Sequence, residues 1–150
     1  ECLEEIRKIW IENNSGYIGN NCNLRSIKDN NMLKAVCKKA NDVCGYAVLY
    51  FKKDFCEIEK YPNYIENMPK KTIYIWEIVT SKNHLKEGVA SNIYNYIKTK
   101  FNDYTIYAAI DEKNIPSLNL HIKEGFTQIY NFYKECDIYE RTDKQFKICL

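Results

Sequence analysis

The first segment of the chain places apolar residues among charged ones with the period of a helix. They recur three or four positions apart, at Leu3, Ile6, Ile9 and Trp10. This spacing predicts an amphipathic helix over residues 2–13 that covers a sheet. A weaker repeat, with Asn23 as a candidate N-cap, predicts a second helix over residues 23–30.

The pattern then changes to that of strands. Residues 32–39 and 43–52 have strand character and are separated by Ala-Asn-Asp, which predicts an antiparallel hairpin. Residues 53–71 contain prolines and many charges but no clear period, and they predict a long loop. The run that follows, residues 72–80, predicts another strand.

A helix and a further strand come next. Residues 88–101 carry an apolar stripe at helical spacing, formed by Val89, Ile93, Ile97 and Phe101. Residues 104–110 are almost continuously apolar, which is typical of a strand buried on both faces. A strand-helix-strand unit of this length implies that residues 72–80 and 104–110 pair in parallel through a right-handed crossover.

The end of the chain predicts a short helix and closing strands. Pro116 suits the first turn of a helix, and Gly125 suits its left-handed end. Residues 126–133 and 137–141 predict two antiparallel strands, and residues 146–150 a final strand-like piece. We therefore predict one domain of 150 residues with a mixed α/β fold. Its sheet is mostly antiparallel with a central parallel pair, and helices cover both faces.

Composition argues against several classes of function. The net charge is only +2 and the lysine pairs are scattered, so we expect no nucleic-acid binding. The seven cysteines are odd in number and lack Cys-x-x-Cys spacing and a secretory leader, which favours reduced thiols and a cytoplasmic location. The two histidines lie far from zinc-ligand spacing, so we expect no metal. No apolar stretch approaches the roughly 20 residues of a membrane helix, and we expect no membrane partner.

The loop before residues 88–101 is the first candidate for chemistry. A helix that begins directly after a loop presents unpaired backbone N–H groups and the positive end of its dipole. Gly88 at this junction lets a phosphate approach the backbone closely. The segment predicts a site for a phosphorylated cofactor, with an ordinary helix start as the alternative.

Two motifs resemble those of the GNAT superfamily of acyl-CoA-dependent N-acetyltransferases. Residues 85–90, Leu-Lys-Glu-Gly-Val-Ala, resemble the family's Arg/Gln-x-x-Gly-x-Gly/Ala, with Leu85 in place of the polar residue. Residues 114–126 resemble its Asn-x-x-Ala/Ser-x-x-Leu-Tyr-x-x-x-Gly-Phe, with His121 in place of the tyrosine. The order of elements also follows the family, except that its usual first strand is missing. A trimmed chain, a longer parent protein, or an edge filled by a second copy in a homodimer would explain this.

The resemblance implies that acetyl-CoA lies across these motifs. Its pyrophosphate would bind backbone N–H groups of the first motif and the helix start, at Leu85, Lys86, Glu87, Gly88, Val89, Ala90 and Ser91. Its pantetheine arm would pair as an added strand with Ile78, Val79 and Thr80. The second motif would contribute Asn114, Ser117 and His121. Asn114 suits a helix cap equally well, and both roles are compatible.

Catalytic roles follow from the same resemblance. Glu77 would take a proton from the substrate ammonium, a backbone N–H near Val79 would stabilise the oxyanion, and His121 would protonate the departing thiolate. A solvent-facing or ion-paired Glu77 and a packed His121 are the alternatives. A rival mechanism uses Cys56 or Cys136 as a nucleophile, although neither has a recognisable histidine partner.

The predicted function is transfer of an acetyl group from acetyl-CoA to a primary amine, by direct attack in a ternary complex. The acceptor is a small-molecule or peptide amine, whose identity the sequence does not specify. Two alternatives stay open: a non-catalytic domain that binds CoA or a protein partner on the same scaffold, and a plain interaction domain.

Overall fold

The computed structural model of the protein describes residues 2–14, 32–52, 69–111, 113–135 and 140–149. The helices in these ranges are α1 (Cys2–Asn14), the short 3₁₀ turn η2 (Lys82–His84), α5 (Val89–Lys100) and α6 (Ile115–Lys123). The strands are β1 (Leu33–Lys39), β2 (Asp42–Phe51), β3 (Thr72–Thr80), β4 (Thr105–Asp111), β5 (Thr127–Glu135) and β6 (Glu140–Cys149).

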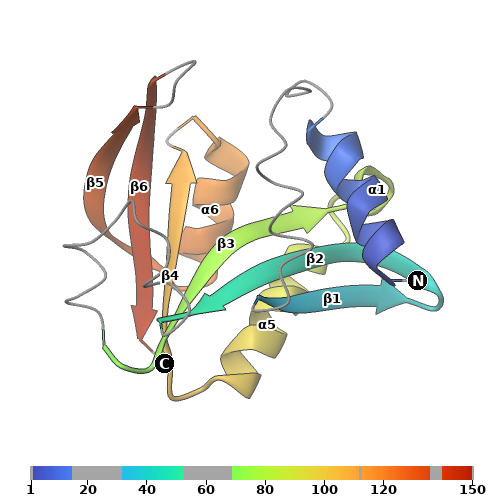
Figure 1. Ribbon diagram of the computed structural model, residues 1–150, viewed down its shortest axis with the longest axis horizontal. Helices are drawn as coiled ribbons and strands as arrows, with labels where there is room; N and C mark the ends of the chain where they lie inside the picture. Colours follow the sequence, from blue (N-terminus) through green and yellow to red (C-terminus); the bar gives the residue numbers. More distant parts are fainter. Residues whose placement is uncertain (1, 15–31, 53–68, 112, 136–139, 150) are drawn as a thin grey trace.

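The strands form one six-stranded mixed sheet in the order β1-β2-β3-β4-β6-β5. Only the neighbours β3 and β4 run parallel among these strands, and every other neighbouring pair is antiparallel. Figure 1 shows α1 in front of the β1-β2-β3 half of the sheet, with α5 behind it. The predicted mixed sheet with a parallel pair is therefore confirmed.

Each face of the sheet buries its own apolar cluster. On one face, Ile6 and Ile9 of α1 pack with Tyr46 and Val48 of β2. On the other, α5 and α6 pack against the sheet through buried side chains that include Ile93, Ile97 and Leu118. We call these the α1 face and the α5 face. Helices on both faces were predicted, and this arrangement confirms them.

The parallel ladder between β3 and β4 is short. It joins Thr72–Ile75 to Thr105–Ala108 and ends there, although both strands continue. A bulge at Trp76 interrupts the pairing of β3 with β2 at the same level, which bends the strand. Beyond this level β3 turns away from β4 (Figure 1). The sheet thus opens into two halves, and the last residues of β3 have no ladder to β4.

Most predicted elements occur where the pattern placed them. The first helix, the hairpin, the strand at residues 72–80 and the helix before residue 101 are confirmed with small shifts at their ends. Gly125 has a φ of 91°, the left-handed end expected for α6. The helix predicted at residues 23–30 and most of the loop predicted at residues 53–71 lie outside the described residues.

The end of the sheet differs from the prediction. The described parts of the two pieces predicted at residues 137–141 and 146–150 belong to one strand, β6, over Glu140–Cys149. The polar residues 142–145 between the two pieces had the pattern of a break between strands. In the fold β6 lies between β4 and β5 and pairs with both, so backbone hydrogen bonds on two sides hold it extended. No helix in the described ranges is long and apolar enough to cross a membrane.

Candidate active site

The strands β3 and β4 diverge beyond Ile75 and Ala108, and we use the word cleft for the region between their carboxyl ends. Ile78, Val79 and Thr80 line its β3 side, and their pairing with β2 leaves their other edge facing the cleft. An extended ligand with amide groups can pair with such an edge as an added strand. The backbone of Ile78, Val79 and Thr80 is thus paired on one side only, and their part in binding a cofactor stays a prediction.

The loop at the head of α5 presents backbone groups to the same region. Gly88 is the N-cap of α5 with a φ of 75°, and no side chain caps the helix. A Cβ built on Gly88 would meet no atom within 4 Å, so the space beside it is open. The N–H groups of Val89, Ala90 and Ser91 in the first turn are thus available to an anion. This geometry suits a pyrophosphate held by backbone donors.

Gly45 allows the start of α5 to lie close to the sheet. A Cβ at Gly45 would lie 2.6 Å from the carbonyl oxygen of Val79 and 2.7 Å from Cγ1 of Val89. The missing side chain lets α5 begin directly against the end of β3. A glycine within a strand often marks such a close approach.

Charges around the loop limit the repulsion that a phosphate would meet. The Glu87 carboxylate lies 3.1 Å from Nδ1 of His84 and 3.4 Å from Nζ of Lys39. Hydrogen bonds from His84 and then Lys39 hold the pKa of Glu87 below its usual value. Leu85, which stands where the family motif has Arg or Gln, is exposed, so its side chain makes few contacts. The cradle therefore depends on backbone donors, with Lys86 exposed beside them.

The second motif begins α6 on the β4 side of the cleft. Oδ1 of Asn114 accepts a hydrogen bond from the backbone N–H of Ser117 at 3.2 Å, which makes Asn114 the N-cap of α6. The cap occupies its amide oxygen and leaves the amide nitrogen as the donor for a ligand. Both predicted roles of Asn114 are compatible with this position.

Glu77 is a carboxylate of β3 beyond the end of the ladder, on the α1 face. It pairs in register with the buried Val48, directly after the bulge at Trp76. Burial raises the pKa of Glu77 to about 7, and the Tyr46 phenol beside it lowers the pKa in part. A carboxyl that titrates near neutrality suits proton transfer from an amine. The predicted acid thus has the environment of a base rather than of a surface ion pair.

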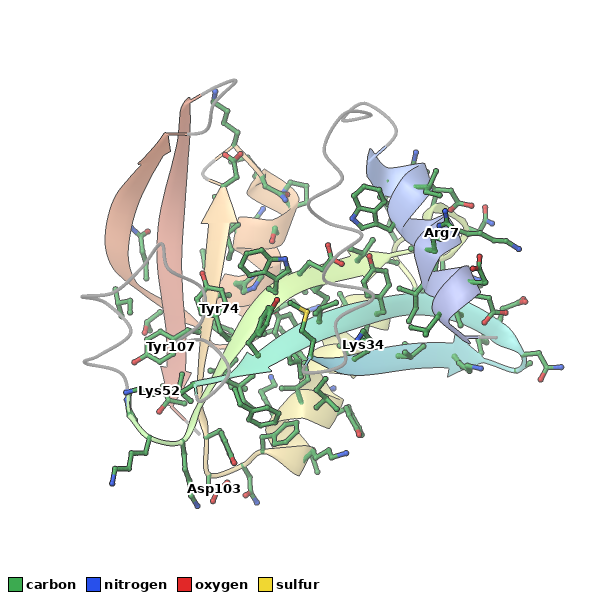
Figure 2. The ribbon with its side chains drawn as sticks, viewed as in Figure 1. Arg7, Lys34, Lys52, Tyr74, Asp103 and Tyr107 are labelled. Atoms are coloured by element: carbon green, nitrogen blue, oxygen red, sulfur yellow. The ribbon has the colours of Figure 1, made fainter. Side chains whose placement is uncertain are left out.

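Aromatic side chains surround the α1 face next to Glu77. Tyr74 of β3 and Tyr107 of β4 are register partners just before the strands separate (Figure 2). The ring of Trp76 meets that of Tyr50 edge to face, with centroids 5.6 Å apart. Among the described residues, Glu77 thus lies next to the aromatic part of the apolar cluster on the α1 face.

These features agree with one family. A model described as the acetyltransferase (GNAT) family matches residues 3–126. The chain belongs to the GNAT acetyltransferase family. No curated protein matches it significantly.

Solved structures share the GNAT fold at low sequence identity. Ribosomal-protein-S18-alanine N-acetyltransferase from Escherichia coli is 9% identical with a TM-score of 0.69, covering 98% of this chain and 86% of that one. An N-acetyltransferase from Staphylococcus aureus Mu50 is 17% identical with a TM-score of 0.67, covering 98% and 93%. A GNAT-family acetyltransferase from Bacillus cereus ATCC 10987 is 17% identical with a TM-score of 0.68, covering 98% and 89%. These similarities show the fold alone.

His121, at the position of the GNAT motif's tyrosine, is buried. Its Nδ1 lies 2.7 Å from the carbonyl oxygen of Ser117 and must carry the proton, since a carbonyl only accepts. Its Nε2 then accepts from the Tyr94 hydroxyl at 2.5 Å. Burial lowers the pKa of His121, against the opposing effects of Ser117 and Glu124. The observed role is packing, and its catalytic role stays a prediction.

The side chain of Ser91 interacts within the protein, a contact that the sequence did not predict. Its hydroxyl hydrogen-bonds the Glu124 carboxylate, which also lies 2.7 Å from Nζ of Lys98. Although burial raises the pKa of Glu124, these two hydrogen bonds lower it overall. The side chain of Ser91 thus ties α5 to the end of α6, and only its backbone remains for a phosphate.

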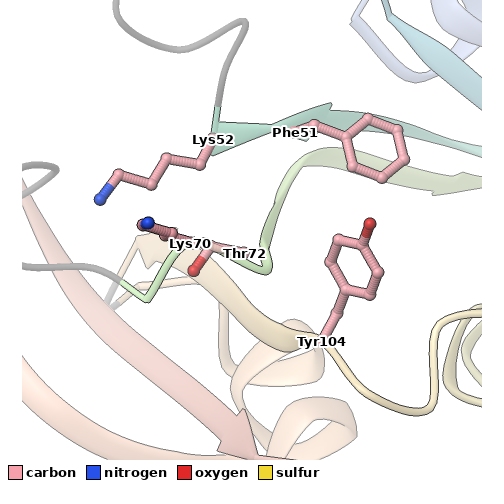
Figure 3. A pocket seen from close by; sticks show the side chains of 5 residues that line it. All are labelled: Phe51, Lys52, Lys70, Thr72 and Tyr104. Carbon is pink, nitrogen blue, oxygen red and sulfur yellow. The ribbon is translucent and has the colours of Figure 1, made fainter.

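A cavity of about 410 Å³ lies away from this cleft. Figure 3 shows its lining, made by Phe51, Lys52, Lys70, Thr72 and Tyr104. Thr72 begins β3 and Tyr104 precedes β4, whereas the cleft opens beyond Ile75. The cavity is therefore at the amino ends of the parallel strands, and we assign it no part in acyl transfer.

The sequence did not single out Tyr46 or Gly45. A tyrosine in an apolar strand gives no signal of its own, because its neighbour across the sheet depends on the bulge at Trp76. Gly45 did carry a usable signal as a lone glycine in a strand. The rival nucleophiles Cys56 and Cys136 lie outside the described residues. Within the described ranges, no group of His, Cys, Asp and Glu is arranged to hold a metal ion.

Proposed function

We propose that this GNAT protein is an N-acetyltransferase that moves an acetyl group from acetyl-CoA to a primary amine in a ternary complex. The observation that carries the proposal is the early end of the β3–β4 ladder at Ile75 and Ala108. It leaves the edge of β3 from Ile78 to Thr80 free of β4, and the same strand carries Glu77 and leads through η2 to the open start of α5. Each suits a different part of the reaction.

The residues present fit acetyl-CoA along its length. The first turn of α5 and the loop at Gly88 would hold the pyrophosphate through backbone N–H groups. The edge of β3 from Ile78 to Thr80 would pair with the pantetheine amides, and Asn114 would bind the arm from α6. Acetyl-CoA supplies an activated acyl group as a thioester.

Proton transfer from the amine is assigned to Glu77. An ammonium must lose its proton before its lone pair attacks a carbonyl carbon, and a base of pKa about 7 accepts that proton at neutral pH. A backbone N–H near Val79 would stabilise the oxyanion. The C–N bond then forms, the C–S bond breaks, and the amide nitrogen releases its second proton as the thiolate gains one. His121 is not assigned to this last transfer, because Ser117 holds its only proton.

One observation favours a second candidate, a CoA-binding domain without catalysis. Both ring nitrogens of His121 form hydrogen bonds within the protein, to Tyr94 and Ser117, so neither is available to donate a proton to the thiolate. Such a domain would bind CoA and release no thiol. Both candidates therefore bind CoA, but only the enzyme releases thiol from acetyl-CoA.

The experiment combines both readouts on the whole chain. CoA and acetyl-CoA are titrated by calorimetry, and thiol release from acetyl-CoA is followed with a panel of small-molecule amines and amino-terminal peptides. Peptides are included because the Escherichia coli fold relative is named for an alanine of a ribosomal protein. Binding with amine-dependent thiol release and intersecting initial-rate patterns supports the proposal. Binding without release supports the second candidate, parallel rate patterns overturn direct transfer, and no binding overturns both candidates.

Gly88→Val is expected to weaken CoA binding at least about tenfold, equal to about 1.4 kcal/mol. A β-branched residue is strongly disfavoured at a φ of 75°, so the loop must change its backbone and move its N–H groups. Calorimetric titration with CoA measures the change. The matched control is Thr99→Val, an exposed site near the other end of α5, which should bind CoA normally. Unchanged affinity in Gly88→Val would remove the loop from the cofactor site.

A further inference from the structure

Two buried polar groups meet on the α1 face without ordinary partners. The Tyr46 hydroxyl and Oε1 of Glu77 are both shielded from solvent, and neither has a hydrogen-bond partner of normal geometry among the described residues. Tyr46 itself is 0% exposed. Leaving such groups unpaired is unfavourable, so their shared location needs an explanation.

Strand register brings these two side chains together. Glu77 is the register partner of Val48, so both point to the same face. Tyr46 lies two positions along β2 from Val48 and therefore also points to that face. It is the diagonal neighbour of Glu77, within reach of a long side chain. The bulge at Trp76 sets this alignment, because without it the face of Glu77 would be reversed.

The phenol and the carboxyl interact electrostatically. Burial raises the pKa of Tyr46 above its usual range, and the charge of Glu77 raises it further. Burial also raises the pKa of Glu77, while the phenol opposes this by favouring the ionised form. The contact is looser than an ordinary hydrogen bond, as is common for catalytic groups before substrate binds.

Other titratable groups lie around Glu77 but do not govern it. The described ones on the elements packed around it are Glu4, Glu5, Arg7, Lys8 and Glu12 of α1, Lys34 of β1, Tyr50 of β2 and Tyr74 of β3. Apart from Glu5, the charged residues of α1 are exposed. Burial and Tyr46 are the influences on the Glu77 pKa.

We propose that Tyr46 is a positioning residue for Glu77, whose phenol donates to the carboxylate and holds it toward the cleft as the base. The ionised carboxylate gains a donor in a site with little water, and its rotamer is fixed. Tyr46 touches neither substrate nor cofactor in this role. The base role of Glu77 rests on the proposed function, whereas its coupling to Tyr46 does not.

Tyr46→Phe tests the proposal with little risk to the fold, because only a hydroxyl is removed. Loss of the donor should raise the pKa of Glu77 by about one unit. Carbon-13 NMR titration of the side-chain carboxyl measures this in the cofactor-free protein, and the acidic limb of kcat/KM should move to higher pH by the same amount. Tyr50→Phe is the matched control, since Tyr50 is also buried on the α1 face of β2. It should move neither quantity.

The outcomes are distinguishable. An unmoved Glu77 titration in Tyr46→Phe overturns the proposal, as does an equal movement in Tyr50→Phe. A moved titration with a moved kinetic limb supports it. A moved titration in a protein that turns over no amine supports the Tyr46–Glu77 coupling and contradicts the proposed function instead.

Discussion

Glu77→Gln is expected to lower kcat/KM by about 10²–10⁴-fold while CoA binding is retained. Glutamine keeps the shape of the side chain but accepts no proton, so the substrate ammonium must lose its proton to water. Steady-state thiol release with the best amine of the panel measures the loss. Because the edge of β3 and the loop at Gly88 are unchanged, calorimetry should give the wild-type affinity for CoA.

The pH profile separates this role from a general disturbance. Glu77 must be ionised to act, and its pKa is raised to about 7, so wild-type kcat/KM should rise with pH through about this value. In Glu77→Gln this limb should disappear and leave a low rate. Glu12→Gln, at an exposed carboxyl of α1, should retain both the rate and the limb. A Glu77→Gln enzyme of wild-type activity would exclude Glu77 as the base.

The same substitution should stabilise the fold at high pH. A carboxyl whose folded pKa exceeds its unfolded pKa binds more protons when folded, so its contribution to stability is present at low pH and is lost as pH rises through about 7. Above this pH, removing the charge should add up to about 3 kcal/mol to the free energy of unfolding. Chemical denaturation across the pH range measures the gain. Stability and activity thus change in opposite directions.

His121→Ala is expected to lower the free energy of unfolding by about 3–5 kcal/mol. His121 is 2% exposed and packs edge to face with Tyr94 and Phe126, with ring centroids 5.3 and 5.1 Å away. Its removal leaves a cavity between α5 and α6, and it leaves the buried Tyr94 hydroxyl without the acceptor Nε2. Urea denaturation at neutral pH measures the loss.

The acid side of the stability curve provides a second readout. The folded pKa of His121 is lowered, so the unfolded chain binds more protons and stability falls as pH drops below about 6.5. Glu77 has the opposite effect between its ordinary pKa of 4.5 and its raised pKa of about 7. The His121 contribution is therefore clearest in a Glu77→Gln background. There, His121→Phe should flatten the slope of stability against pH below about 6.5. A loss below about 1 kcal/mol in His121→Ala would contradict its packing role.

Local patterns predicted the backbone positions on which the candidate site depends, the N-caps of α5 and α6. Gly88 needed only a loop followed by an apolar stripe, and Asn114 needed only cap chemistry before Pro116. Such features arise within one turn of chain, so neighbouring residues specify them. The strand at residues 72–80 was equally local. Its end at Thr80 and the helix after it therefore appeared where expected.

Features that depend on pairing between distant strands were not predictable in this way. The bulge at Trp76 decides which face Glu77 occupies, and nothing in the local sequence shows it. The contact of Tyr46 with Glu77 follows from that bulge and was missed. His121 is similar: its spacing matched the family motif, but the partner that buries it, Tyr94, comes from a different helix. The continuity of β6 was not predictable either, because it depends on pairing with β4 on one side and β5 on the other.

The short ladder between β3 and β4 has a consequence for the protein without its cofactor. Past Ile75 and Ala108, the chain carries a strand edge in the middle of its own sheet. Exposed edges of this kind are templates for unintended pairing between chains, and proteins usually blunt them with charges or cover them. Here the pantetheine arm would be the cover. If acetyl-CoA binds as proposed, it would therefore keep the protein soluble as well as serve as its substrate, and the cofactor-free protein would be the form prone to self-association.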